Sequence, residues 1–66
     1  MQTVPEKQPI LQKLLRASEV AEILDVSKAF VYQLIQRGLL RSVRIGTSRR
    51  IRMEDLLHFI EENSVA

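Results

Sequence analysis

The sequence predicts a small, mainly α-helical domain that contains one β-hairpin. Two stretches in the first half of the chain and one at its end carry apolar residues at helical spacing. Between them, residues 42–52 change to an apolar–polar alternation of period two, which is typical of short strands. At 66 residues the chain is expected to form one domain, with the element order helix, turn, helix, hairpin, helix.

The chain is expected to divide into one domain with a short tail at each end. Residues 1–10 include Pro5 and Pro9 among polar side chains and show no apolar period, which predicts a flexible N-terminal tail. The domain is expected to occupy residues 11–63, and residues 64–66 are expected to form a C-terminal tail.

The first two helices are expected to be joined by a tight turn. Apolar residues at helical spacing predict the first helix from about Ser18 to Leu24. Asp25 breaks this pattern where such turns often have glycine, and aspartate adopts left-handed dihedrals more readily than most residues. Ser27 is a good N-cap for a second helix that runs through Gln36, because its hydroxyl can accept a free amide of the first turn.

The second helix and the last helix also have recognisable ends and faces. Arg37 and Gly38 should end the second helix, because a cation suits its negative pole and glycine adopts left-handed dihedrals. The last helix is expected from about Met53 to Asn63. It should direct four apolar residues toward the core: Leu56, Leu57, Phe59 and Ile60.

The hairpin is expected between these two helices. Val43 and Ile45 alternate with polar residues, and Ile51 alternates with arginines after a turn at Gly46-Thr47-Ser48. We therefore expect one narrow apolar face and one basic face.

The first two helices carry apolar residues where a helix-turn-helix needs its contacts: Val20, Ala21, Leu24, Val26, Val31 and Leu34. A small residue at Ala21 lets the helices approach closely, and Val26 is expected to fill the turn. Val31 and Leu34 are expected to seat the second helix against the first. The polar residues of the second helix are left on its outer face.

Positive charge is concentrated in residues 28–52, which we call the basic segment. It carries seven basic side chains and no acidic one: Lys28, Arg37, Arg41, Arg44, Arg49, Arg50 and Arg52. The whole chain nets +2, because residues 1–27 sum to −1 and residues 53–66 to −4. Clustered charge of one sign steers and holds a polyanion such as nucleic acid. The alternative is a solvated basic face, although such faces usually intersperse acids.

Several classes of function are disfavoured. The chain has no cysteine and a single histidine, His58, so a zinc site is not expected. No serine stands beside a base, and the adjacent Glu61 and Glu62 point to different faces of a helix, so we expect no catalytic residue and no cofactor. No apolar run approaches the roughly 20 residues that span a bilayer. We expect a cytoplasmic, nucleoid-associated prokaryotic protein with no membrane partner.

The outer face of the second helix suits a DNA major groove. Gln33 can pair with adenine, Lys28 can reach guanine or phosphate, and the Ala29 methyl suits a thymine methyl. Tyr32 is interpreted either as a phosphate contact or as a half-buried packing residue. Arg37 is interpreted either as a phosphate contact or as a helix cap.

An ordered string of short segments carries a family resemblance over residues of about 14–61. The segments are LRASEVAEIL at residues 15–24, Val26-Ser27, Val31-Tyr32, Leu34-Ile35, Arg37-Gly38-Leu39-Leu40, Val43-Arg44-Ile45-Gly46, Arg50-Ile51-Arg52 and Glu54-Asp55-Leu56. This string resembles the small excisionase-like DNA-binding proteins, which are related to the N-terminal domain of MerR-type regulators. The resemblance implies a winged helix-turn-helix, whose second helix enters the major groove and whose hairpin wing touches an adjacent minor groove or backbone.

The resemblance also implies the residues that contact DNA. The groove-facing positions of the second helix fall on Ser27, Lys28, Ala29, Tyr32 and Gln33, and the wing positions fall on Arg44, Thr47, Ser48, Arg49 and Arg50. By their charge, Arg37 is added to the contacts of the second helix and Arg52 to those of the wing, both as candidates for phosphate contact.

Three positions depart from the family pattern. Arg16 stands where a capping threonine is frequent, Phe30 replaces a small polar residue, and Arg49 replaces a frequent wing aromatic. Phe30 is interpreted as either covering the hairpin or packing into a groove.

The function implied by the resemblance is sequence-specific binding of double-stranded DNA. An excisionase would bend DNA near an attachment site and direct site-specific recombination toward excision. An integrase and further copies of the same protein are candidate partners. Two alternatives stay open: a minimal MerR-like transcription regulator, and a protein–protein interaction adaptor that uses Phe30, Leu39, Leu40 and the outer face of the last helix.

Overall fold

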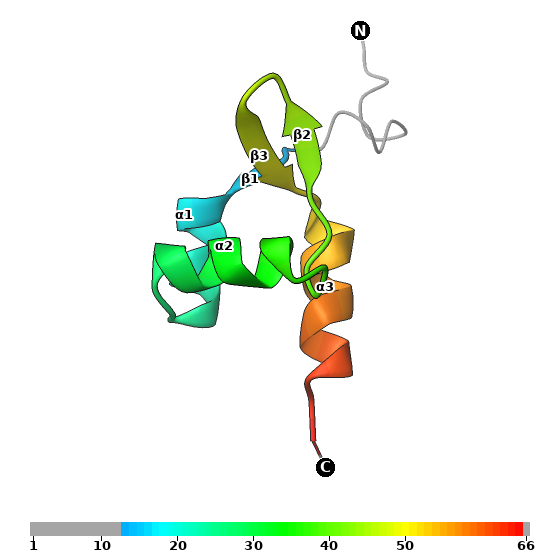
Figure 1. Ribbon diagram of the computed structural model, residues 1–66. Helices are drawn as coiled ribbons and strands as arrows, with labels where there is room; N and C mark the ends of the chain where they lie inside the picture. Colours follow the sequence, from blue (N-terminus) through cyan, green and yellow to red (C-terminus); the bar gives the residue numbers. More distant parts are fainter. Residues whose placement is uncertain (1–12, 66) are drawn as a thin grey trace, which may run out of the picture.

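A computed structural model describes residues 13–65, which contain three helices and three short strands. In chain order these are β1 (Leu15–Arg16), α1 (Ala17–Leu24), α2 (Lys28–Gln36), β2 (Val43–Ile45), β3 (Ser48–Ile51) and α3 (Met53–Glu62). Figure 1 shows the sheet at one end of the molecule, with the α1–α2 pair and α3 extending from it. The mainly α-helical fold with a small hairpin is confirmed. The expected tail at residues 1–10 lies outside the described residues.

The turn between α1 and α2 is closed by the backbone. Asp25 has a φ of 59°, so aspartate adopts the left-handed conformation there, as predicted. The Val26 N–H donates to the Ala21 carbonyl at 2.9 Å, a hydrogen bond that closes a helix end of the Schellman type. Val26 was expected to fill the turn, but its side chain is 37% exposed, so this expectation is wrong.

The ends of α2 are those that the sequence predicts. Ser27 Oγ accepts a hydrogen bond from the Phe30 N–H at 3.0 Å and caps the helix. At the other end Gly38 has a φ of 76°, and the Leu39 N–H donates to the Leu34 carbonyl at 2.9 Å. These local hydrogen bonds fix the length of α2.

The sheet has three strands in the order β1-β3-β2, and both pairs are antiparallel. β1 was not predicted as a strand, because two residues are too few to show a period. Leu15 of β1 lies directly opposite Ile51 of β3, and both side chains are buried. The sheet therefore ties the start of α1 to the end of the hairpin.

The hairpin turn is one residue shorter than the sequence suggested. Ile45 pairs with Ser48, so Gly46 and Thr47 alone form the loop. Gly46 has a φ of 63° and Thr47 has no positive φ, which is the pattern of a type II′ turn. Loop length fixes the register of a hairpin, and a shift of one residue moves side chains to the other face.

This register distributes the hairpin arginines over both faces of the sheet. A three-residue turn would have placed Val43 opposite Ile51, but Val43 pairs with Arg50. Ile51 follows Arg50 along β3 and therefore points to the opposite face, where Arg44 and Arg49 form a second direct pair. The expectation of one apolar and one basic face is wrong.

The core lies where the sheet meets the helices. Its buried residues are Leu15, Ala17, Val20, Ala21, Val31, Leu34, Leu40, Ile51 and Leu56. Four of the six contacts expected for a helix-turn-helix are among them (Val20, Ala21, Val31 and Leu34), and Leu24 is half-buried against them. The packing of α2 on α1 is therefore as predicted.

α3 contributes less to this core than expected. Leu56 is buried and Phe59 is half-buried against the core. Leu57 is 56% exposed and Ile60 is also exposed, so their expected core-facing positions are wrong. A helix turns by about 100° per residue, so Leu57 points well away from the side on which Leu56 packs.

Candidate nucleic-acid interface

α2 offers one long side to solvent while α1 covers the other. Its two buried residues are Val31 and Leu34. All of the groove-facing candidates are exposed: Ser27, Lys28, Ala29, Tyr32 and Gln33. Tyr32 is 39% exposed, so its ring is partly packed and still reaches solvent. The helix therefore presents a polar outer face long enough to meet a groove.

The N-terminus of α2 is unusually positive. Its first turn contains no acidic residue, and Lys28 is the first helical residue. Helix N-termini attract anions, and a cation there adds to that attraction although it does not stabilise the helix. Ser27 uses an acceptor site of its hydroxyl for the cap, so its O–H remains able to donate to a phosphate oxygen.

The basic segment has almost no counter-charge. Ion pairs within residues 13–65 join Lys13 to Glu19, Arg52 to Glu54 and His58 to Glu62. Of the seven cations in the basic segment, therefore, only Arg52 has a carboxylate within 4.0 Å in that part of the chain. Its pair, at 3.8 Å, is exposed on both sides and stabilises little.

The arginines of β3 are held against the hairpin by neutral acceptors. Arg49 Nη1 donates to Ser42 Oγ at 3.2 Å, and Arg50 Nη1 donates to the Arg49 carbonyl at 3.0 Å. Both residues are half-buried, whereas Arg44 and Thr47 are exposed. Direct pairing of Arg44 with Arg49 places like charges opposite each other, which destabilises a sheet. An anion would relieve that repulsion.

The remaining candidates lie at the margins of this surface. Arg37 is exposed and occupies the C-cap of α2, so its charge already favours the helix end. Ser48 is half-buried opposite Ile45. Arg52 follows the last residue of β3 and is the N-cap of α3, which places it outside the hairpin.

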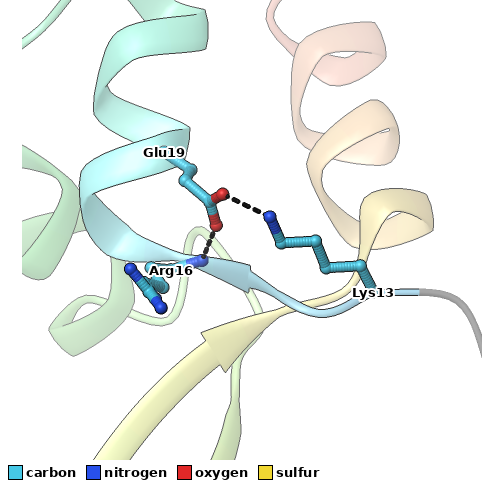
Figure 2. A network of polar contacts seen from close by, with 3 residues as sticks. All are labelled: Lys13, Arg16 and Glu19. Atoms are coloured by element: carbon cyan, nitrogen blue, oxygen red, sulfur yellow. Dashed lines mark hydrogen bonds and ion pairs between the residues drawn. The ribbon is translucent and has the colours of Figure 1, made fainter.

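A polar network at the start of α1 joins Lys13, Arg16 and Glu19 (Figure 2). None of these three residues was predicted as a DNA contact. Glu19 Oε1 accepts the Arg16 N–H at 2.7 Å, and Glu19 Oε2 accepts from Lys13 Nζ at 2.8 Å. These two hydrogen bonds hold the pKa of Glu19 below its usual value, and the one from the Arg16 N–H has the larger effect. The Arg16 guanidinium has no acceptor atom, so it cannot cap the helix in return.

The described residues include no cluster of metal-binding side chains and no helix that could span a membrane. Within residues 13–65, no three His, Cys, Asp or Glu side chains are grouped so that they could hold a metal ion. His58 Nε2 lies 3.3 Å from Glu62 Oε2 on an exposed face of α3. Among the same residues no helix has the length and apolar character needed to cross a bilayer.

Comparison with known proteins agrees with this geometry. A family model described as a helix-turn-helix domain matches residues 14–64. "Putative DNA-binding protein MT0521" and "Putative DNA-binding protein Rv0500A", from two strains of Mycobacterium tuberculosis, are each 38% identical over 56 residues. The matched region is 85% of this chain and 72% of each relative.

A shorter match covers part of a larger protein. "Uncharacterized protein YvgK" of Bacillus subtilis (strain 168) is 46% identical over 41 residues, which are 62% of this chain and 13% of that protein. No solved structure matches the chain significantly. Because the family model covers most of its length, this chain belongs to the helix-turn-helix domain family.

Proposed function

We propose that this protein binds double-stranded DNA, with α2 in the major groove and the wing, residues 43–51, against the neighbouring backbone or minor groove. The observation that carries the proposal is the unneutralised basic segment: six of its seven cations have no carboxylate partner among residues 13–65. They lie on α2, on the wing and on the loop between them. The names of the Mycobacterium tuberculosis relatives support the same activity.

We divide the candidate contacts into base readers and phosphate contacts. Gln33, Lys28 and Ala29 are assigned to base edges, because their amide, ammonium and methyl groups match adenine, guanine and thymine. The phosphate contacts are assigned to Ser27, Tyr32, Arg37, Arg44, Thr47, Ser48, Arg49, Arg50 and Arg52. Phosphate contacts give affinity and fix the position of the protein on the duplex, whereas contacts to base edges give sequence specificity.

The finer role that we propose is that of an excisionase-type factor, which bends DNA near an attachment site and biases an integrase toward excision. Its support is the resemblance of the ordered segments described above. Smooth bending of a short site costs a few kcal/mol, and contacts from two elements can offset that cost. A MerR-like regulator would use the same surface at promoters. Sequencing the DNA that the protein binds in cells separates the two roles. Sites beside attachment sequences would support the excisionase role, and sites in promoters would support the regulator.

A protein–protein adaptor is the candidate from another class, and exposed apolar residues favour it. Leu39 and Leu57 are each 56% exposed, and Phe30 is also exposed. Leu40 was expected on the same docking surface, but it is 1% exposed and belongs to the core, so that expectation is wrong. An adaptor gives the cations no role beyond solubility and predicts weak, salt-insensitive behaviour toward DNA.

The deciding experiment is fluorescence-anisotropy binding to random duplex DNA over a salt series. Each neutralised phosphate contributes about −0.9 to the slope of log affinity against log salt concentration. Engagement of four to six cations should give a slope of about −4 to −5. A flat response would exclude the excisionase and the regulator together and leave the adaptor.

A further inference from the structure

Arg16 and Arg50 form a like-charged pair across β1 and β3. The register places them directly opposite each other, so both side chains leave the same face of the sheet. Cβ atoms at such positions are about 4.5–5.5 Å apart, and like charges there destabilise the sheet. This face is opposite the one that carries Ile51 and the pair formed by Arg44 with Arg49.

The charge of Glu19 attracts the Arg16 guanidinium, but no carboxylate within residues 13–65 pairs with it directly. It is the N-cap of α1, where a cation meets the positive pole of the helix and where arginine cannot accept a hydrogen bond. The nearby acid, Glu19, binds the Arg16 N–H and Lys13 Nζ instead (Figure 2). Neither Arg16 nor Arg50 lies within 4.0 Å of a carboxylate in residues 13–65. The exposed Arg16 therefore opposes stability in two ways, and the solvent-screened attraction to Glu19 offsets little of that cost.

We propose that Arg16 and Arg50 together hold one backbone phosphate of bound DNA, which makes β1 part of the interface. The proposal rests on the DNA binding proposed above. A phosphodiester between two guanidinium groups removes their repulsion and accepts charge-assisted hydrogen bonds from both. Arg44 and Arg49 offer a second such pair on the other face. The sheet thus presents an arginine pair to phosphates on either side of the wing.

The informative variant is Arg16→Thr. Threonine at this position can accept the Glu19 N–H while Glu19 continues to accept the N–H of residue 16, which completes a capping box. The variant should therefore fold, with a higher melting temperature than the wild type. Its affinity for random duplex DNA should fall about tenfold, as expected for the loss of a hydrogen bond to a charged group. Its salt slope should shrink by about 0.9.

Three further variants separate a shared phosphate site from a general effect of charge. Arg16→Lys keeps the charge and should keep the wild-type salt slope. Val65→Glu lowers the net charge by the same amount as Arg16→Thr, at a residue that is 93% exposed beyond α3, and should leave the slope unchanged. Arg16→Thr combined with Arg50→Thr should lose less affinity than the two single losses predict, because both residues hold one phosphate.

The outcomes separate this proposal from the proposed function. Wild-type slope and affinity in Arg16→Thr, together with a reduced slope in Arg50→Thr, would leave DNA binding intact and overturn the two-arginine site. A slope lost equally in Arg16→Thr and Val65→Glu would also overturn it, because net charge would then be the cause. A wild-type protein with no salt dependence would remove the proposed function itself.

Discussion

Leu15 lies directly opposite Ile51 in the pairing of β1 with β3, and both side chains are buried. This contact joins the residue just before the α1 N-cap to the last residue of the wing. The position of the wing relative to the helix-turn-helix therefore depends on one apolar pair as well as on the sheet hydrogen bonds.

Ile51→Ala should reduce the free energy of unfolding by about 2–5 kcal/mol, because it removes a fully buried side chain from a core of nine residues. Urea denaturation followed by circular dichroism measures this change. Ile45→Ala is the matched control: Ile45 is 53% exposed on β2, and its loss should cost about 0.5 kcal/mol or less. Equal losses in the two variants would contradict the assigned register.

The helices were predictable because their signals are local. Ser27 and Gly38 act within a few residues of their own positions, and the period of Val31 and Leu34 identifies the buried side of α2. The exposure of the groove-facing candidates follows from the same period. Asp25 also has the predicted conformation, because the turn demands it of whichever residue stands there.

The strands were less predictable because their pairing is not local. Nothing near Leu15 in the sequence indicates that its partner is Ile51. Neither β1 nor the Arg16–Arg50 pair could therefore be predicted from the sequence. The segment Gly46-Thr47-Ser48 is rich in turn formers and does not by itself fix the loop at two residues. The basic and apolar residues of the wing could therefore be predicted from the sequence. Which of them share a face depends on the strand register, which only the structure shows.

Stability at acid pH should depend on Glu19. The pKa of Glu19 is lowered in the folded protein by the Arg16 N–H and by Lys13, so the unfolded chain binds a proton more readily than the folded chain. The resulting stabilisation is present above the unfolded pKa, whose usual value is 4.5, and is lost as the pH falls through the folded value.

Thermal melts of Glu19→Gln at a series of pH values test this dependence. The variant should melt below the wild type at pH 7, and the difference should narrow below about pH 4.5. Glu22→Gln, on the exposed side of the same helix, is the control and should show no such convergence. A Glu19→Gln deficit that stays constant down to pH 2 would show that charge is not the cause.

Asp25→Gly should stabilise the fold, because glycine adopts the left-handed conformation at a φ of 59° without the cost that a Cβ atom adds. We expect a gain of about 0.5–1 kcal/mol, measured by thermal and urea denaturation. Asp25→Val should lose stability, because β-branched residues are strained in this conformation. A destabilised Asp25→Gly would indicate that the aspartate side chain makes a contact that outweighs the strain.

The same Asp25→Gly variant should bind DNA more tightly at low salt. The substitution removes an acid from the turn that immediately precedes α2, and so reduces repulsion of the phosphate backbone. The gain should diminish as salt screens the interaction. Anisotropy titrations at low and high salt measure it, with Asp25→Asn separating the effect of charge from that of the backbone. Equal affinities of Asp25→Asn and wild type at low salt would place the turn away from DNA.

Gln33→Ala and Arg50→Ala should distinguish base reading from phosphate contact, once a specific site has been selected from random DNA. Gln33→Ala should cost about 1–3 kcal/mol of binding free energy on that site and little on random duplex, because a bidentate base contact is lost. Arg50→Ala should weaken both DNAs alike and reduce the salt slope by about one. Titrations of each variant against both duplexes give the comparison. Equal losses on specific and random DNA for Gln33→Ala would show that the exposed face of α2 does not read bases, because a residue that contacts phosphate alone cannot discriminate between sequences.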